Sequence, residues 1–184
     1  MKRTTRRSFL AASAASLATP TLLRANEITV DRNMSGFMAQ NWQDHFDALD
    51  RVTVLCDTNA RALHYWNPEN DDYRIYPTSV PQTDELTKRG LTEIVRKKHN
   101  PSWTPTANMR ERDPSLPVTM AGGEVGNPLG TRAMYLAWPA YLIHGTHDTR
   151  KIGRRSSSGC IGLFNFMVEE LYDITPVGTQ VRVL

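Results

Sequence analysis

The chain has 184 residues, of which 40% are hydrophobic and 22% charged, as is typical of one globular domain that can bury a core. Its formal charge of +3 comes from five basic residues before Asn26; removing them from the 22 leaves 17 Lys and Arg against 19 Asp and Glu. A body with a slightly negative charge gives no support for binding to nucleic acid.

The first 25 residues have the pattern of an export signal. The basic start consists of Lys2, Arg3, Arg6 and Arg7, and the apolar run at residues 9–18 is too short to span a bilayer. Residues 5–10, Thr-Arg-Arg-Ser-Phe-Leu, are typical of twin-arginine signals, and we predict cleavage after Ala25. The alternative is a basic amphipathic arm. Export predicts a location in the periplasm or at the cell surface.

The rest of the chain predicts a mostly β domain with one or two short helices. Residues 26–50 are predicted as a linker or lead-in helix, and whether they cap a substrate groove is left open. Strands at residues 51–56, 62–66 and 73–76, separated by turn-forming residues, predict an antiparallel meander. Further strands are expected at 92–97, 133–138, 140–144 and 179–184, with a helix over 166–173.

A long stretch rich in Pro and Gly, residues 100–127, interrupts this pattern. Irregular segments of this length inside a compact domain are commonly lids or substrate grooves. A surface loop without a function is the alternative. After it, the strand pair 133–138 and 140–144 leads directly to the candidate chemistry.

That chemistry consists of His144, at the end of an apolar run, and Cys160, on a Ser/Gly-rich loop. A thiol nucleophile with an imidazole as general base requires these two residue types. Two cysteines in an exported protein ordinarily predict a disulfide. Cys56, however, lies in a β-branched apolar run and is interpreted as a buried strand residue, which leaves Cys160 free. A zinc site formed with His147 is disfavoured, because positions i and i+3 of a strand face opposite ways.

Several ordered motifs resemble those of the L,D-transpeptidase (YkuD-type) catalytic domain. In that family an Ile-His-Gly-Thr strand end precedes a Ser-His-Gly-Cys loop. The matching segments here are Ile143-His144-Gly145-Thr146, Ile152-Gly153, Ser157-Ser158-Gly159-Cys160-Ile161, Asn165, Leu171-Tyr172 and Gly178-Thr179-Gln180-Val181. Upstream, Trp103-Thr104-Pro105, Met120-Ala121-Gly122-Gly123 and Asn127-Pro128-Leu129-Gly130 resemble one branch of it. The similarity covers nearly all of residues 51–184 and implies a β-sandwich-like YkuD fold.

The resemblance implies a peptidoglycan enzyme that needs no metal or organic cofactor. Cys160 would attack the carbonyl of the third residue of a tetrapeptide stem, release D-alanine, and pass the acyl group to an amine. That amine belongs to another stem, to an outer-membrane lipoprotein or to a free D-amino acid. His144 would be the base, oriented by the carbonyl of Gly145, and the N–H groups of Gly159 and Cys160 would form the oxyanion hole.

Further residues are candidates for substrate binding. They are Trp103, Gly122, Gly123, His147, Ser157, Ser158 and Asn165, the last through hydrogen bonds that pin the loop after Cys160. Aromatic residues such as Trp103 are also common in cores, and His147 also fits an exposed turn.

The chain departs from the family pattern at two positions. Ser158 stands where the family most often has His, and Gly162 stands where it usually has Arg. A guanidinium there could hold a substrate carboxylate or brace the loop. Arg154 and Arg155 either replace that charge or form a solvated turn. Three functions therefore stay open: transpeptidase, hydrolytic L,D-carboxypeptidase or endopeptidase, and a catalytically silent module that binds peptidoglycan.

Overall fold

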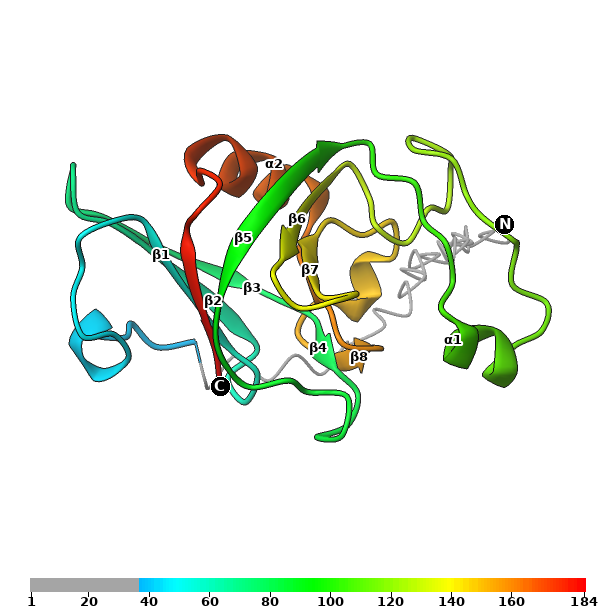
Figure 1. Cartoon of the computed structure of the whole chain (residues 1–184), viewed down its shortest axis with the longest axis horizontal. Helices are drawn as coiled ribbons and strands as arrows, with labels where there is room; N and C mark the ends of the chain where they lie inside the picture. The colour runs from blue at the N-terminus through cyan, green and yellow to red at the C-terminus, as the bar shows by residue number, and fades with distance from the viewer. Residues whose placement is uncertain (1–36) are drawn as a thin grey trace, which may run out of the picture.

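The computed structural model describes residues 37–184, and Figure 1 shows their arrangement. The predicted export signal and the start of the lead-in lie outside this range. Eight strands form one sheet in the order β3-β2-β1-β10-β5-β6-β7-β9, and two short strands, β4 and β8, form a second. The fold is mostly β with two α-helices, which confirms the predicted class.

The N-terminal meander consists of β1 (Thr53–Asp57), β2 (Ala62–Asn67) and β3 (Asp72–Pro77). They pair antiparallel, as the alternation of apolar runs and turn residues predicted. The first turn is held by Asp57, whose side chain accepts from the backbone N–H groups of Asn59 and Ala60 at 2.9 Å. The second turn contains Asp71 at a positive φ of 53°.

The C-terminal strand β10 (Gln180–Val183) joins this meander to the second half of the sheet. It pairs parallel with β1 and antiparallel with the long strand β5 (Gly90–His99). β5 then continues to β6 (Arg132–Leu136), β7 (Leu142–His144) and β9 (Ile161–Gly162). Strand pairing between distant segments thus places β7 between β6 and the edge strand β9, in the half of the sheet away from the meander.

Helix α2 (Asn165–Ile174) closes the main core. Its buried residues Val168, Leu171 and Tyr172 have the 3-4 spacing of one helix face, and they pack in the cluster that contains Met134 and Ile143. The predicted helix, 166–173, therefore differs from the observed one by a single residue at each end.

The described part of the lead-in, residues 37–50, is a short 3-10 turn, η2 (Trp42–Asp44), followed by irregular chain. Phe46 and Trp42 pack against Leu55 and Trp66, on the sheet face away from the main core. The described lead-in therefore packs on the meander and contributes no residue to the cleft described below.

Several short elements were not predicted. They are β4 (Val80–Pro81), β8 (Arg155–Ser157), η3 (Thr149–Lys151), β9 and α1 (Ala107–Arg112), which begins inside the long Pro/Gly-rich stretch. Strands of two or three residues have no periodicity to detect, because they are defined by their pairing with distant chain. Helix α1 does have signals, since Thr106 caps it by accepting from Met109 N–H and Pro114 follows its end.

Candidate active site

The predicted general base, His144, ends β7 and is buried. Strand pairing places it opposite Ala133 of β6 and Gly162 of β9. Its ring nitrogen Nδ1 lies 2.5 Å from the carbonyl oxygen of Gly145. A carbonyl can only accept, so Nδ1 carries the proton and Nε2 keeps a free lone pair. This tautomer of imidazole is the one that can take a proton through Nε2.

The nucleophile loop, residues 157–160, makes a tight turn between β8 and β9. Ser157 Oγ donates to the carbonyl oxygen of Cys160 at 2.6 Å and accepts from Gly159 N–H at 3.3 Å. Gly159 has a φ of +140°, and an added Cβ would lie 3.3 Å from the Tyr141 ring, so the turn requires glycine. In the structure Gly159 N–H donates to Ser157 Oγ within the loop, whereas the prediction assigned this N–H group to the oxyanion hole. The N–H of Cys160 is the remaining predicted donor.

The thiol of Cys160 is half-buried beside the start of β7. Its Sγ donates to the carbonyl oxygen of Ala140 at 3.5 Å rather than to His144. Burial raises the thiol pKa to about 11, and the N–H of Leu142 opposes that rise by hydrogen bonding. Burial also lowers the pKa of His144 to about 4, against the hydrogen bond to the Gly145 carbonyl. At neutral pH both groups are therefore uncharged.

Both groups line one cleft of about 610 Å³. The cleft brings together, from separate parts of the chain, the predicted residues Trp103, His144, His147, Ser157, Ser158 and Cys160. The Pro/Gly-rich stretch with α1 also contributes Thr106, Met109, Arg112, Asp113, Leu116, Pro117 and Met120 to the lining. The prediction that this stretch forms a substrate groove agrees with the cleft.

Three predicted binding residues lie elsewhere. Gly122 packs against Asn100, where an added Cβ would lie 1.8 Å from the backbone oxygen, and Gly123 follows it in the turn with a φ of +81°. Asn165 accepts from Thr131 N–H at 3.2 Å, so it does not pin the loop after Cys160 as predicted. None of the three lines the cleft. Gly122 and Asn165 hold backbone segments close together, and Gly123 supplies the positive φ of its turn.

Gly162 is enclosed by Ser79, which explains why the position has no side chain. The two residues exchange backbone hydrogen bonds of 2.8 and 3.0 Å, and an added Cβ would lie 2.3 Å from Ser79 Oγ. An arginine at this position would collide with Ser79 unless that side chain moved. The glycine is therefore matched to its neighbour in this chain.

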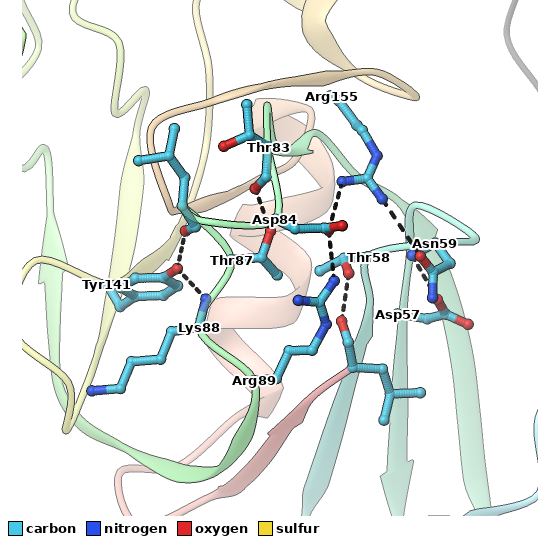
Figure 2. A network of polar contacts seen from close by, with 12 residues as sticks. Asp57, Thr58, Asn59, Thr83, Asp84, Thr87, Lys88, Arg89, Tyr141 and Arg155 are labelled. Atoms are coloured by element: carbon cyan, nitrogen blue, oxygen red, sulfur yellow. Dashed lines mark hydrogen bonds and ion pairs between the residues drawn. The ribbon is translucent and has the colours of Figure 1, made fainter.

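The two arginines considered as replacements do not supply a charge to the cleft. Arg155 lies 3.5 Å from Asp84 and from Asn59 Oδ1, and Figure 2 shows this network. Arg154 is exposed and also does not line the cleft. Of the two interpretations, the structure supports the solvated turn.

Residues 79–89 form hydrogen bonds to the start of the nucleophile loop and to β8. Gln82 N–H donates to Ser157 O at 3.0 Å, and its side chain donates to Ser156 O at 3.2 Å. In Figure 2 the Tyr141 hydroxyl joins this segment to the strand region before His144, accepting from Lys88 N–H at 2.5 Å and donating to Leu86 O. The turn around Gly159 is thus held by the ring of Tyr141 and by main-chain contacts.

Sequence reasoning missed the cleft residues contributed by α1, as well as Ser79 and Lys151. The cap at Thr106 was a usable signal for α1. Ser79 had none, because only the pairing of β4 with β8 brings it to Gly162.

Within residues 37–184 no group of three His, Cys, Asp or Glu side chains is placed to hold a metal ion. No helix in that range has both the length and the apolar character needed to cross a membrane.

Comparison with known proteins agrees with this site. The YkuD model, described as the L,D-transpeptidase catalytic domain, matches residues 51–183. A putative L,D-transpeptidase from the ATP synthase subunits region of Fuscovulum blasticum is 60% identical over 94% of this chain and 91% of its own length. The probable L,D-transpeptidase ErfK/SrfK of Escherichia coli is 38% identical over 73% of this chain, which spans only 44% of that relative.

Solved structures give the same fold. An L,D-transpeptidase from Mycobacterium smegmatis aligns with a TM-score of 0.54 at 19% identity, over 73% of this chain and 58% of that one. L,D-transpeptidase 3 from Mycobacterium tuberculosis aligns with a TM-score of 0.56 at 14% identity, over 72% and 60%. The family model, the relatives and the fold agree, and the chain belongs to the YkuD family of L,D-transpeptidase catalytic domains.

Proposed function

We propose that this chain is a periplasmic peptidoglycan L,D-transpeptidase whose nucleophile is Cys160. One observation carries the proposal: a free thiol on the loop before β9 and a neutral imidazole at the end of β7 line the same cleft. The orientation of His144 by the Gly145 carbonyl supports its role as base, because it leaves Nε2 free.

The reaction begins when the Cys160 side chain turns from Ala140 toward His144. Nε2 takes the thiol proton as Sγ attacks the carbonyl carbon of the third stem residue, and Cys160 N–H stabilises the oxyanion. The imidazolium then gives the proton to the leaving D-alanine nitrogen, which leaves a thioester on Sγ. One proton is thus relayed from sulfur through Nε2 to the leaving nitrogen, and no redox partner is needed.

The second half-reaction releases the enzyme. An acceptor amine on a neighbouring stem attacks the thioester carbonyl, and His144 takes its proton. The C–S bond breaks and the proton returns to Sγ, so the free thiol is restored. Attack by water instead of the amine would give the L,D-carboxypeptidase or endopeptidase reaction. A lipoprotein amine would give anchoring instead of cross-linking.

The catalytically silent, peptidoglycan-binding relative is the second candidate, and Gly162 is the observation that favours it. The enclosing contact with Ser79 weighs against this candidate, because it gives the glycine a packing reason independent of activity.

These functions are tested by incubating the mature protein with a disaccharide tetrapeptide and measuring its intact mass. The products are separated by liquid chromatography, and Cys160→Ala is the control. We expect a thioester adduct, release of D-alanine and a cross-linked dimer, all dependent on Cys160. Monomeric tripeptide alone would establish hydrolysis. Folded protein that forms no adduct, neither with the tetrapeptide nor with a carbapenem, would establish the silent relative.

The proposed location depends on the twin-arginine motif of residues 5–10. Replacing Arg6 and Arg7 with lysine should retain the protein in the cytoplasm. Cell fractionation of the wild-type and the twin-lysine variant measures this, and equal periplasmic recovery of both would contradict it.

A further inference from the structure

Arg112, at the end of α1, reaches across the cleft to the nucleophile loop. Its Nη2 donates to Ser158 Oγ at 3.2 Å, and its Nε donates to the carbonyl oxygen of Asn108 at 3.2 Å. The side chain is exposed and lines the same cleft as Cys160. Ser158 and Cys160 are two residues apart, a backbone separation of at most about 7 Å. The guanidinium is therefore anchored to the nucleophile loop, two residues from Cys160, in the cleft that the thiol lines.

The charges that line the cleft are suited to an anion. They are Arg112 and Lys151, both cationic, and one carboxylate, Asp113. Asp113 Oδ1 already accepts from the N–H and the hydroxyl of Ser115, at 3.1 and 2.6 Å. Within residues 37–184, neither Arg112 nor Lys151 has a carboxylate oxygen within 4.0 Å. Positive charge in this cleft is thus left without a protein partner.

The guanidinium also has donors to spare. Of its five N–H groups, two are used by Ser158 and Asn108, which leaves three directed by the planar fork. Such a fork binds a carboxylate through two parallel hydrogen bonds.

We propose that Arg112 binds a carboxylate of the donor stem peptide and so sets the specificity of the cleft for an anionic donor. The proposal rests on the proposed transpeptidase function. The proposal assigns to α1 the positive charge that Gly162 cannot supply. Helix α1 precedes the nucleophile loop in the sequence, whereas Gly162 follows it. A tetrapeptide that ends in meso-diaminopimelate and D-alanine offers two such carboxylates near the scissile bond, one on the diaminopimelate side chain and one at the terminus.

Calorimetric binding to the Cys160→Ala protein tests this without depending on turnover. Three tetrapeptides are compared: the free acid, the terminal amide and the side-chain amide. A charge-assisted hydrogen bond corresponds to about tenfold to a hundredfold in Kd. We expect one of the two amides to bind that much more weakly, and the amide that does so identifies the carboxylate. Arg112→Ala should weaken binding of the free acid equally and abolish the difference between acid and amide.

Arg110→Ala is the matched control, because Arg110 lies on the same helix, donates to the carbonyl oxygen of Val118 and does not line the cleft. It should keep the full preference for the free acid. Arg112→Lys, which retains charge but loses the fork, should keep a reduced preference. Thermal melting establishes that each variant is folded.

Equal binding of all three peptides to the parent protein, or an acid preference that survives in Arg112→Ala, would overturn the assignment. Turnover of the tetrapeptide by the wild-type protein is measured in parallel. Turnover with no carboxylate preference removes only the role of Arg112, whereas tight, Arg112-dependent binding without turnover removes only the transpeptidase function.

Discussion

Two regions of the molecule each contain a cysteine and a histidine, yet in only one of them do the two side chains line the same cleft. In the meander, Cys56 pairs with Leu63 and His64 pairs with Leu55, so the thiol and the imidazole lie on opposite faces. At the other end, Cys160 and His144 line one cleft.

Electrostatics does not separate the two pairs. Burial raises the pKa of both thiols, to about 12 for Cys56 and about 11 for Cys160. Burial likewise lowers the pKa of both imidazoles to about 4. The difference is what surrounds them, since His64 packs in a cluster of three rings with Trp66 and Tyr73, which also stack on each other, and bonds to the Tyr73 hydroxyl at 2.8 Å. A shared cleft, and not a shifted pKa, distinguishes a reactive pair from a packed one.

The largest expected effect is that of the two cysteines on activity. Cys160→Ala should lower the turnover of tetrapeptide by at least about a thousandfold, because removal of a nucleophile leaves only binding and oxyanion stabilisation. Cys56→Ala should leave kcat unchanged and lower the free energy of unfolding by about 1–2 kcal/mol through the cavity that it leaves. Steady-state kinetics and urea unfolding measure the two effects. Similar activity losses in both variants would contradict the comparison.

The histidines should separate in the same way. His144→Gln should reduce kcat by about a hundredfold to ten-thousandfold, the usual contribution of a general base. His64→Gln can retain a hydrogen bond to Tyr73 and should change stability without changing kcat. Circular dichroism first establishes that both variants are folded. Steady-state kinetics at pH 7 then measures kcat for each of them. A His64→Gln protein that is folded but inactive would refute the separation.

Thiol reactivity should rise steeply with pH at Cys160. Because its pKa is raised to about 11, the thiolate fraction grows about tenfold per pH unit below that value. The rate of alkylation by iodoacetamide should therefore rise about a hundredfold from pH 7 to pH 9. Mass spectrometry measures this rate. Cys56 is fully enclosed and should react only in unfolded protein, which serves as the internal control. A rate at Cys160 that is independent of pH would instead indicate a thiolate–imidazolium pair.

The smallest effect concerns the packing of Gly162. Gly162→Ala forces a Cβ to within 2.3 Å of Ser79 Oγ, and such overpacking costs about 1–3 kcal/mol. Ser79→Ala removes that oxygen and leaves Ser79 Cβ at 3.7 Å, an ordinary contact. The double variant should therefore recover most of the stability lost in Gly162→Ala. Urea unfolding of the three variants completes the cycle, and purely additive losses would rule out the contact as the cause.

The positions of the major strands were predictable because each has a long enough pattern. The strands at 53–57, 62–67 and 72–77 follow the predicted segments closely, and so does helix α2. The cleft was less predictable. The sequence correctly predicted Trp103 and His147 as cleft residues, but Gly122, Gly123 and Asn165 lie outside the cleft. A glycine motif indicates that another part of the chain comes close to the backbone, and it does not identify that part.

By itself, the sequence determined the mostly β class, the candidate nucleophile and base, and the segment that borders the cleft. Each of these depends on local pattern or on an ordered set of motifs. Tertiary structure alone decided which side chains meet: Ser79 against Gly162, Gly159 N–H against Ser157, and Arg112 against Ser158. The physical reason is that such contacts arise from pairing and packing between segments far apart in the chain, or from turn geometry, and neither leaves a period in the sequence.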